Sequence, residues 1–324
     1  MNYIDTKNIV IIFYLTISFI IIEIPLVSGN KILKKQQKQA KNNKKIKEKI
    51  VLKYIYPKIP SAVWLTPSET WQPTKKLDRE KPIVVIIPSY KNAQWYTYNL
   101  DSVFAQNYEN YRVIYLDDCS PDGTGDLVEA FIKLRKQEDR VTLFKNKVRV
   151  GALANIYNAV HMSDTKSIIV TLDGDDWLAH CNVFQMLNEA YEDSNVWLTY
   201  GQFRQFSDDL IGFCEAFPKE IIDNNNYRSY KWITSHLRTF YAWLFKEIKI
   251  EDLMLNGKFF IMTWDLAFML PMLEMSGGRF TFIQDVHYIY NITNVINDFK
   301  VDSNLQVKLE HIIRSMKPYN RINK

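Results

Sequence analysis

The chain has 324 residues, of which 47% are hydrophobic and 24% are charged, and this composition is typical of a globular protein and excludes a disordered or fibrous chain. The formal net charge is +5, but ten lysines between Lys31 and Lys53 are opposed only by Glu48, so this stretch carries +9. The rest of the chain is therefore mildly acidic, which argues against nucleic-acid binding by the folded part. The three cysteines are widely spaced, and their odd number excludes a fully paired disulfide framework or a cysteine zinc cluster.

An apolar segment lies near the N-terminus, at Ile9–Ile22, and continues past Glu23 to Val27. Its length suits the core of a signal peptide, with a small-residue cleavage site at residues 27–29, while a spanning helix needs about 20 apolar residues. Because the lysine run that follows resists translocation, we expect residues 1–30 to anchor the chain in a membrane with the folded part on the cytoplasmic side. Export through a cleaved signal peptide is the alternative. Residues 31–80 are interpreted as a basic linker and a lead-in rich in Pro and Trp.

From about Lys81 short runs of Ile and Val alternate with amphipathic stretches of helical length, which is typical of a parallel sheet with crossover helices. The predicted strands are Ile83–Ile87, Arg112–Leu116, Val141–Phe144 and Ser167–Leu172. The predicted helices lie near Tyr96–Ala105, Gly125–Lys136, Ala152–His161, Val183–Tyr191 and Val307–Ile313. Because ligands of open α/β sheets bind beyond the carboxyl ends of the strands, the residues that follow each strand are the candidates for a functional site.

Three acids follow the second predicted strand, between Asp117 and Thr124. Turn and helix-capping chemistry explains Asp122 and Thr124, but it does not explain why Asp117 and Asp118 stand side by side at the strand end. The glycines at 123 and 125 are similar to the start of a dinucleotide-binding fingerprint. Val128 stands where the third glycine of that fingerprint belongs, so a Rossmann cofactor site is excluded.

A second acidic cluster, Asp173-Gly174-Asp175-Asp176, follows the fourth predicted strand. Three carboxylates this close repel one another unless a cation or solvent relieves them, and Mg²⁺ or Mn²⁺ prefers such oxygen ligands. An acidic surface turn is the alternative. An EF-hand is excluded, because Leu178 and Phe184 stand where that loop needs glycine and glutamate. A polymerase palm could carry the same acids, but the crossover pattern and the acidic folded part argue against it.

Four motifs stand in order at the ends of predicted strands. They are Ile86–Tyr90, Asp117–Thr124, Gly151–Asn155 with Asn158-Ala159, and Leu172–Trp177. Together they resemble the motifs of family 2 glycosyltransferases with the GT-A fold, over residues 81–202 and more loosely to about 291. The resemblance implies an α/β fold, with a Rossmann-like, mostly parallel sheet flanked by helices. Cys119 and Lys91 depart from the family's usual glycine and asparagine.

The resemblance also implies a division of labour. Residues 81–202 are expected to bind a nucleotide-sugar donor, residues 203–300 the acceptor, and residues 301–324 to form a C-terminal helix and tail. The implied donor contacts are Pro88, Ser89, Tyr90, Asp118, Gly151, Asn155 and Asp173. The implied metal contacts are Asp173 and Asp175, with His287 as a further ligand, although a packed histidine in an apolar strand is the simpler interpretation of His287.

A general base is implied at Asp265, where Trp264 replaces the glutamate of the family's usual Glu-Asp pair. An acid that merely favours the start of a helix is the alternative interpretation of Asp265. Aromatic and cationic residues between the two halves are candidates for acceptor contacts, because sugars stack on aromatic faces and diphosphates pair with cations. Much of this aromatic content could equally belong to the core. The acceptor candidates are Trp177, Arg228, Trp232, His236 and Arg238.

The expected activity is therefore an inverting, metal-dependent transfer of a hexose from a nucleoside diphosphate sugar, with UDP as the expected nucleotide, to the hydroxyl group of a glycan, lipid or protein. Mn²⁺ or Mg²⁺ is the expected cofactor. The N-terminus is expected to contact the membrane. A sugar nucleotidyltransferase and a non-catalytic sugar-binding module are the alternatives that the sequence leaves open.

Overall fold

The computed structural model describes residues 8–10, 23–25, 71–74, 77–296 and 298–323. The chain divides into two units, residues 1–60 and residues 61–324. In the first unit β1 (Asn8–Val10) pairs antiparallel with β2 (Glu23–Pro25). Most of the expected anchor or signal peptide, and the whole basic linker as far as residue 70, lie outside the described residues. Among the residues that are described, no helix combines the length and the apolar character needed to cross a bilayer.

An eight-stranded sheet forms the centre of the second unit. Its strands in chain order are β3 (Ile83–Ser89), β4 (Tyr111–Asp117), β5 (Val141–Lys145), β6 (Ile168–Thr171), β7 (Trp177–Leu178), β8 (Leu198–Phe206), β9 (Arg238–Tyr241) and β12 (Phe280–Asn291). Their spatial order is β5-β4-β3-β6-β9-β8-β12-β7. The first four strands in that order are parallel to one another, and β12 is parallel to β8. By contrast β9 is antiparallel to both β6 and β8, and β7 is antiparallel to β12.

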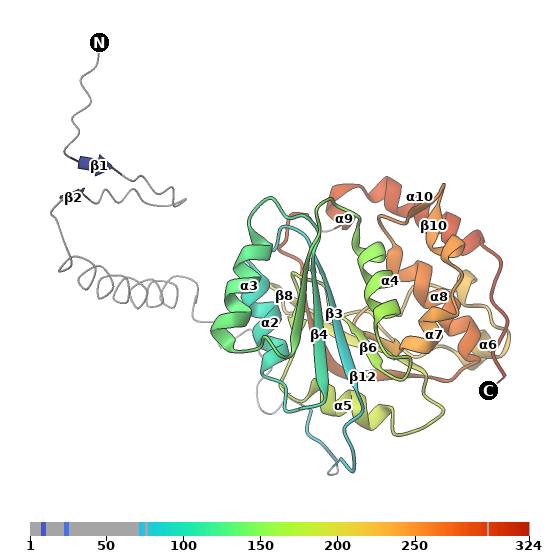
Figure 1. Ribbon diagram of the computed structural model, residues 1–324. Coiled ribbons are helices and arrows are strands. Elements are labelled where there is room, and N and C mark those ends of the chain that lie inside the picture. The colour runs from blue at the N-terminus through green and yellow to red at the C-terminus, as the bar shows by residue number, and fades with distance from the viewer. Residues whose placement is uncertain (1–7, 11–22, 26–70, 75–76, 297, 324) are drawn as a thin grey trace. The chain divides into compact units, whose positions relative to one another are not determined.

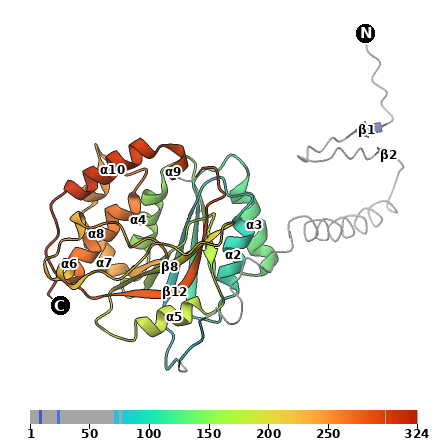
Figure 2. The same ribbon diagram turned by 180° about the vertical axis from the view of Figure 1, so that it is seen from behind.

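Helices cover both faces of this sheet, which explains why its central strands are apolar on both sides. The longer helices are α2 (Tyr96–Phe104), α3 (Thr124–Arg135), α4 (Ala152–Met162), α5 (Val183–Ala190), α8 (Trp264–Ser276) and α10 (Ser303–Ser315). The shorter helical segments are α6 (Lys219–Asp223), η2 (Tyr227–Ser229), α7 (Ala242–Lys246), η3 (Ile250–Leu253) and α9 (Asp298–Val301). A small hairpin joins β10 (Met254–Leu255) to β11 (Lys258–Phe259). Figures 1 and 2 show α2 and α3 on one face and α4, α7, α8 and α10 on the other.

All four predicted strands and all five predicted helices are present, each within a few residues of its predicted bounds. Every residue of β3 is buried, as expected for the centre of a doubly covered sheet. The sequence did not indicate the strands of the second half, because β9 and β7 are short and the exposed and buried positions of β12 do not alternate regularly. The predicted boundary between residues 202 and 203 falls inside β8.

Helix α8 is apolar around its whole circumference, and its residues from Leu266 to Ser276 are all buried. Near its end Glu274, whose side chain is fully buried, accepts hydrogen bonds from the guanidinium of Arg228 at 2.6 and 3.0 Å. Glu274 also accepts from the backbone N–H of Tyr319 at 2.9 Å, and Arg228 donates to the carbonyl of Ile313. The ion pair therefore ties η2, α10 and the C-terminal tail to α8.

Removing one member of a buried ion pair leaves the other charge without compensation, at a cost of about 3 to 5 kcal/mol. We therefore expect Glu274→Gln to lower the free energy of unfolding by that amount, as measured by urea denaturation of the full chain. The control is Asp223→Asn, which breaks the exposed pair between Lys219 and Asp223 and should cost at most about 1 kcal/mol. Equal effects of the two substitutions would contradict a structural role for Glu274.

Candidate active site

The acidic loop that joins β6 to β7 lies directly against the end of β3. Its Gly174 donates a backbone hydrogen bond to the carbonyl of Pro88 at 3.2 Å. A Cβ atom on Gly174 would lie 2.6 Å from Nδ2 of Asn92 and 2.7 Å from Oγ of Ser89. Only glycine fits such a close approach without displacing these side chains. Gly174 therefore allows the neighbouring carboxylates of the acidic cluster to lie close to the end of β3.

The side chain of Asn99 in α2 also binds this acidic loop. Its side chain is fully buried, and its amide group donates to the backbone carbonyls of Asp173 and Asp176 at 2.9 and 2.8 Å. Buried amides are retained where they satisfy backbone groups that have no other partner. Nothing in the sequence distinguishes Asn99 from the other polar residues of α2, Thr97, Asp101 and Ser102.

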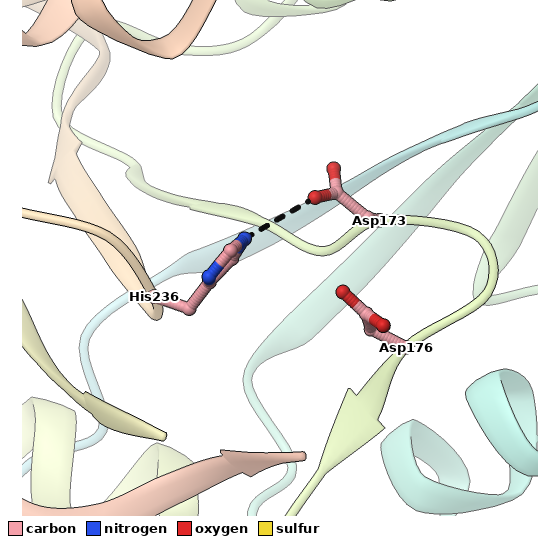
Figure 3. A group of neighbouring side chains, drawn as sticks. All are labelled: Asp173, Asp176 and His236. Carbon is pink, nitrogen blue, oxygen red and sulfur yellow. Dashed lines mark ion pairs between the residues drawn. The ribbon is translucent and has the colours of Figure 1, made fainter. Parts of the chain in front are cut away.

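Asp173, Asp176 and His236 converge on one point, with one potential ligand atom from each within 4.8 Å of the others. Figure 3 shows the two acids on the loop after β6 and His236 on the segment that precedes β9, with the imidazole facing Asp173. Nε2 of His236 lies 3.4 Å from Oδ2 of Asp173. Carboxylate oxygens and a neutral imidazole are donors that suit Mn²⁺ and related divalent ions. The residues present therefore fit a divalent metal.

Asp176 is the most deeply held of these acids. Its Oδ2 accepts from the hydroxyl of Tyr288 at 2.6 Å, and its Oδ1 accepts from the backbone N–H of Asn291 at 2.7 Å. Burial, with the charges of Asp175 and Asp173, raises the pKa of the Asp176 carboxyl well above its usual value. A cation at this point would relieve that repulsion, which is a second reason why the group fits a divalent metal.

Asp175 was expected to pair with Asp173 at the metal. Its side chain is partly exposed, and its Oδ2 accepts from the amide of Asn294 at 2.7 Å. Burial of the carboxyl and the charge of Asp173 raise the pKa of Asp175 to about 6. The structure groups Asp176 rather than Asp175 with Asp173 and a histidine, so a direct metal contact of Asp175 stays a prediction.

One buried guanidinium joins the acidic loop to the start of α8. Arg238 is 1% exposed; its side chain lies 3.6 Å from Oδ2 of Asp173 and donates to Oδ2 of Asp265 at 3.2 Å. It also lies over the ring of Trp264, 5.3 Å from the ring centre. Burial would raise the pKa of Asp173, but the hydrogen bond from His236 and the charge of Arg238 outweigh it and lower this pKa. Two acids from separate elements thus share one cation.

The aromatic residues around His236 orient its ring. The imidazole is stacked between Tyr288 and Tyr290, with ring centres 4.6 and 5.0 Å away. Its Nδ1 is 2.8 Å from the hydroxyl of Ser235. Burial and the charge of Arg238 lower the pKa of His236, against the opposing effect of Asp173, which favours the neutral imidazole that a metal requires. The sequence analysis proposed His236 for acceptor binding only.

The residues expected to contact a donor lie at the ends of β3 and β4 and at the start of α4. Asp118 is buried, and its carboxylate accepts from the backbone N–H groups of Val150 and Gly151 at 2.9 and 2.8 Å and from the amide of Asn146 at 2.9 Å. Burial would raise the pKa of Asp118, but these hydrogen bonds lower it. Asn155 accepts from the same amide of Asn146. At this end of the site the loop that precedes α4 therefore folds around the Asp118 carboxylate.

Pro88, Ser89 and Tyr90 follow one another out of β3 beside that carboxylate. The hydroxyl of Ser89 accepts from the Tyr115 hydroxyl at 2.8 Å, and the carbonyl of Ser89 accepts from the backbone N–H of Asp118 at 2.8 Å. The structure therefore brings together all the residues that were expected to bind a donor, although none of these contacts by itself tests that role.

Several candidates lie elsewhere. The ring of Trp177 is fully buried against Tyr98 and Phe206, so it offers no face to an acceptor. Arg228 is committed to the buried ion pair with Glu274, nine residues and about 14 Å along α8 from Asp265. Trp232 is half-buried against the core. The packing of Trp177 and the ion pair of Arg228 leave neither side chain free for an acceptor, and the role of Trp232 stays a prediction.

The imidazole of His287 also points away from the acids. A Cβ atom on Gly201 would lie 1.9 Å from its Cε1, and its Nδ1 is bonded to the carbonyl of Asp285 at 2.7 Å. It is the hydroxyl of the adjacent Tyr288 that reaches Asp176, at 2.6 Å. Burial lowers the pKa of His287 to about 4. The packed interpretation of this histidine therefore fits the structure better than the metal ligand.

Comparison with known proteins gives matches that all name glycosyltransferases. A family model described as glycosyl transferase family 2 matches residues 84–260. An uncharacterized glycosyltransferase of Rickettsia bellii is 27% identical over 135 residues, which are 42% of this chain and 19% of that protein. The UDP-Glc:alpha-D-GlcNAc-diphosphoundecaprenol beta-1,3-glucosyltransferase WfgD of Escherichia coli is 27% identical over 143 residues, which are 44% of this chain and 53% of that protein. The chain thus spans about half of one relative and a fifth of the other.

A solved structure supports the fold assignment. The crystal structure of S. aureus TarS 1-349 superposes with a TM-score of 0.51 at 16% identity, covering 65% of this chain and 60% of that one. This likeness confirms the predicted α/β class, a large and mostly parallel sheet flanked by helices in the GT-A manner.

Proposed function

Because the chain belongs to glycosyl transferase family 2, we propose that it transfers a sugar from a nucleotide-activated donor to the hydroxyl group of an acceptor. The convergence of Asp118, the acidic loop and Asp265 at one edge of the sheet carries this proposal. The name of the E. coli relative, which specifies UDP-Glc, supports a UDP-sugar as donor. The family match favours transfer over the two alternatives, a sugar nucleotidyltransferase and a non-catalytic module.

The donor nucleotide binds along the ends of β3 and β4. Pro88, Ser89 and Tyr90 line the nucleoside, and the Asp118 carboxylate accepts a hydrogen bond from the base. Gly151 and Asn155 lie where the ribose and diphosphate pass towards Asp173. Backbone N–H groups at the start of α4 favour anionic groups there.

A divalent ion, Mn²⁺ or Mg²⁺, is held by Asp173, Asp176 and His236, with Asp175 beside them. When bound, it neutralises the charge that gathers on the departing diphosphate. The protein itself keeps these carboxylates close together although their negative charges repel one another. Asn99, Tyr288 and Asn291 do so through the hydrogen bonds described above.

Asp265 is the proposed base for an inverting reaction. It is the acid in the first turn of α8, where a negative charge interacts favourably with the helix dipole. Its side chain is 22% exposed, so one oxygen can reach an acceptor while the other contacts Arg238. As the bond between the anomeric carbon and the diphosphate breaks, the acceptor oxygen bonds to that carbon and Asp265 takes the hydroxyl proton. The acceptor is a glycan, lipid or protein.

The metal assignment predicts a loss of nucleotide binding. Asp175→Asn and His236→Gln should each remove most of the Mn²⁺-dependent affinity for UDP and most of the nucleotide release from UDP-sugars, because His236 is a proposed ligand and Asp175 carries a negative charge beside the cation. Isothermal titration with and without Mn²⁺ measures the affinity, and a panel of nucleotide sugars measures the release. The control is Asp126→Asn on the exposed start of α3. Unchanged metal-dependent affinity in both site variants would refute the assignment.

The base assignment predicts a separation of turnover from binding. Asp265→Asn keeps size and hydrogen bonding but cannot accept a proton, so turnover should fall by about 10² to 10⁴ while UDP affinity changes little. Initial rates of transfer and calorimetric UDP binding check the two quantities. Glu251→Gln, an exposed acid of η3, should leave both unchanged. Near-normal turnover in Asp265→Asn would require another base.

We further propose that residues 1–30 anchor the protein in a membrane, with the folded part in the cytoplasm. The apolar segment followed by ten lysines supports this topology. Deletion of residues 1–30 should release a protein that stays in the supernatant after ultracentrifugation of lysed cells and still cleaves donor sugar. N-terminal sequencing of the mature protein that begins at Asn30 would instead establish a cleaved signal peptide.

A further inference from the structure

A cavity, here named the indole cavity, lies at the end of the sheet opposite to the acidic loop. Ser194, Asn195, Trp197, Trp243 and Arg279 line it, and its volume is about 420 Å³. Trp197 directly precedes β8, Arg279 directly precedes β12, and Trp243 lies in α7, which follows β9. Because β12 is parallel to β8 and β9 is antiparallel to it, the beginnings of two strands and the end of the third meet at this cavity.

Helix α8 separates the indole cavity from the proposed base. Asp265 lies in the first turn of α8, and Arg279 follows the last residue of that helix, Ser276, by three positions. The backbone N–H of Arg279 donates to the carbonyl of Ser276 at 3.2 Å. The 13 residues of α8 span about 20 Å. A single sugar-sized ligand in the indole cavity therefore lies outside the site proposed for transfer.

Two indole rings and a guanidinium group form the wall of the cavity. The ring centres of Trp197 and Trp243 are 4.9 Å apart, and their planes are inclined by 75°. The guanidinium carbon of Arg279 lies 4.5 Å from the centre of the Trp197 ring. Trp197 is only 7% exposed, whereas Trp243 is half-buried. Trp243 therefore offers the larger aromatic surface to a ligand, and Trp197 supports it from behind.

Backbone hydrogen bonds fix the segments that carry these rings. The N–H of Trp197 donates to the carbonyl of Arg279 at 2.9 Å, and the carbonyl of Trp197 accepts from the N–H of Tyr241 at 3.0 Å. The N–H of Trp243 donates to the carbonyl of Thr165 at 3.1 Å. The wall of the cavity is thus held in place before a ligand arrives, which lowers the entropic cost of binding.

The remaining side chains favour an uncharged ligand with many hydroxyl groups. Ser194 and Asn195 lie in an exposed turn, and their hydroxyl and amide groups can both donate and accept hydrogen bonds. The acids Glu192 and Asp193 precede them in the same turn, so the charge of Arg279 does not make the cavity a site for anions. The Nη1 atom of Arg279 is also directed at backbone carbonyls, 3.5 and 3.4 Å away.

We propose that the indole cavity binds one uncharged sugar unit of a glycan, with a face of the sugar on Trp243 and its hydroxyl groups bonded to Ser194 and Asn195. Sugars stack on aromatic faces, and small-molecule sites are clefts of about 300 to 1,000 Å³ with aromatic walls and a few polar groups. The cavity is then a second carbohydrate site, which holds the enzyme on a glycan away from the site of transfer. This inference goes beyond the proposed function and does not depend on it.

A printed panel of uncharged oligosaccharides, built from hexoses and N-acetylhexosamines, tests the full chain without nucleotide or metal. The wild-type chain should bind at least one member, and titration with that oligosaccharide then measures the affinity. Trp243→Ala should weaken the affinity by about tenfold or more, because truncation removes the main contact surface. Asn195→Ala, in an exposed turn where folding is not at stake, should weaken it by about 2- to 10-fold.

Two further variants separate the cavity from general effects of the substitutions. Trp243→Phe keeps a flat ring at the same position and should keep most of the affinity. The matched control is Trp95→Ala, which removes a half-buried tryptophan that contacts Phe206 at the other end of β8. It should leave the affinity for the oligosaccharide unchanged.

The opposite results would overturn the second site. They are a wild-type chain that binds no oligosaccharide of the panel, equal affinities of Trp243→Ala and the wild-type chain, or equal losses in Trp243→Ala and Trp95→Ala. A chain that binds an oligosaccharide through Trp243 but releases nucleotide from no nucleotide sugar would contradict the proposed function and leave the second site intact.

Discussion

The shared guanidinium of Arg238 is the interaction on which the site depends. Asp173, Asp175, Asp176 and Asp265 reach one edge of the sheet, and the buried Arg238 is the cation that contacts two of them. The potential ligand atoms of Asp173, Asp176 and His236 all lie within 4.8 Å of one another. Two like charges 4.8 Å apart repel by about 3 to 4 kcal/mol at an effective dielectric constant of about 20. One guanidinium cannot balance four carboxylates. Burial, together with the remaining repulsion, raises the pKa values of Asp175 and Asp176, and a further cation at the loop would relieve that repulsion.

The surrounding structure holds the acids against this repulsion. Asn99 fixes the loop backbone, Tyr288 and Asn291 fix Asp176, and Gly174 lets the loop pack against β3. These contacts come from α2, β12 and β3, which meet only when the sheet is complete. Preorganised groups of this kind need little rearrangement when charge develops in a reaction. The fold thus supplies in advance the charge distribution that the proposed sugar transfer, with a nucleoside diphosphate as its leaving group, needs.

The sequence predicted the first half of the fold well, because β3 to β6 are runs of Ile and Val with amphipathic helices between them. It also indicated the two acidic loops, because turn and capping chemistry explains only some of the acids that follow the strands. It could not predict which histidine faces the acids. The choice between His236 and His287 depends on tertiary contacts, which place Tyr288 against Asp176 and His287 against Gly201. From the sequence Arg238 was only a candidate for acceptor contact and Asn99 was not a candidate at all, because the roles of both come from contacts far apart in the chain.

The path of β8 has a consequence for protein engineering. This strand runs from Leu198 to Phe206 and pairs with β9 and β12. The strands that end at the proposed donor motifs therefore belong to the same hydrogen-bonded sheet as β9, whose Arg238 contacts the proposed base. A chimera that exchanged the two halves between relatives at residue 202 would cut through a strand and break the ladder on both sides. Crossover points in the exposed turn at residues 192–195 would keep every strand whole. Crossover points for recombining donor and acceptor specificity should therefore lie between strands and need not coincide with the limits of the motifs.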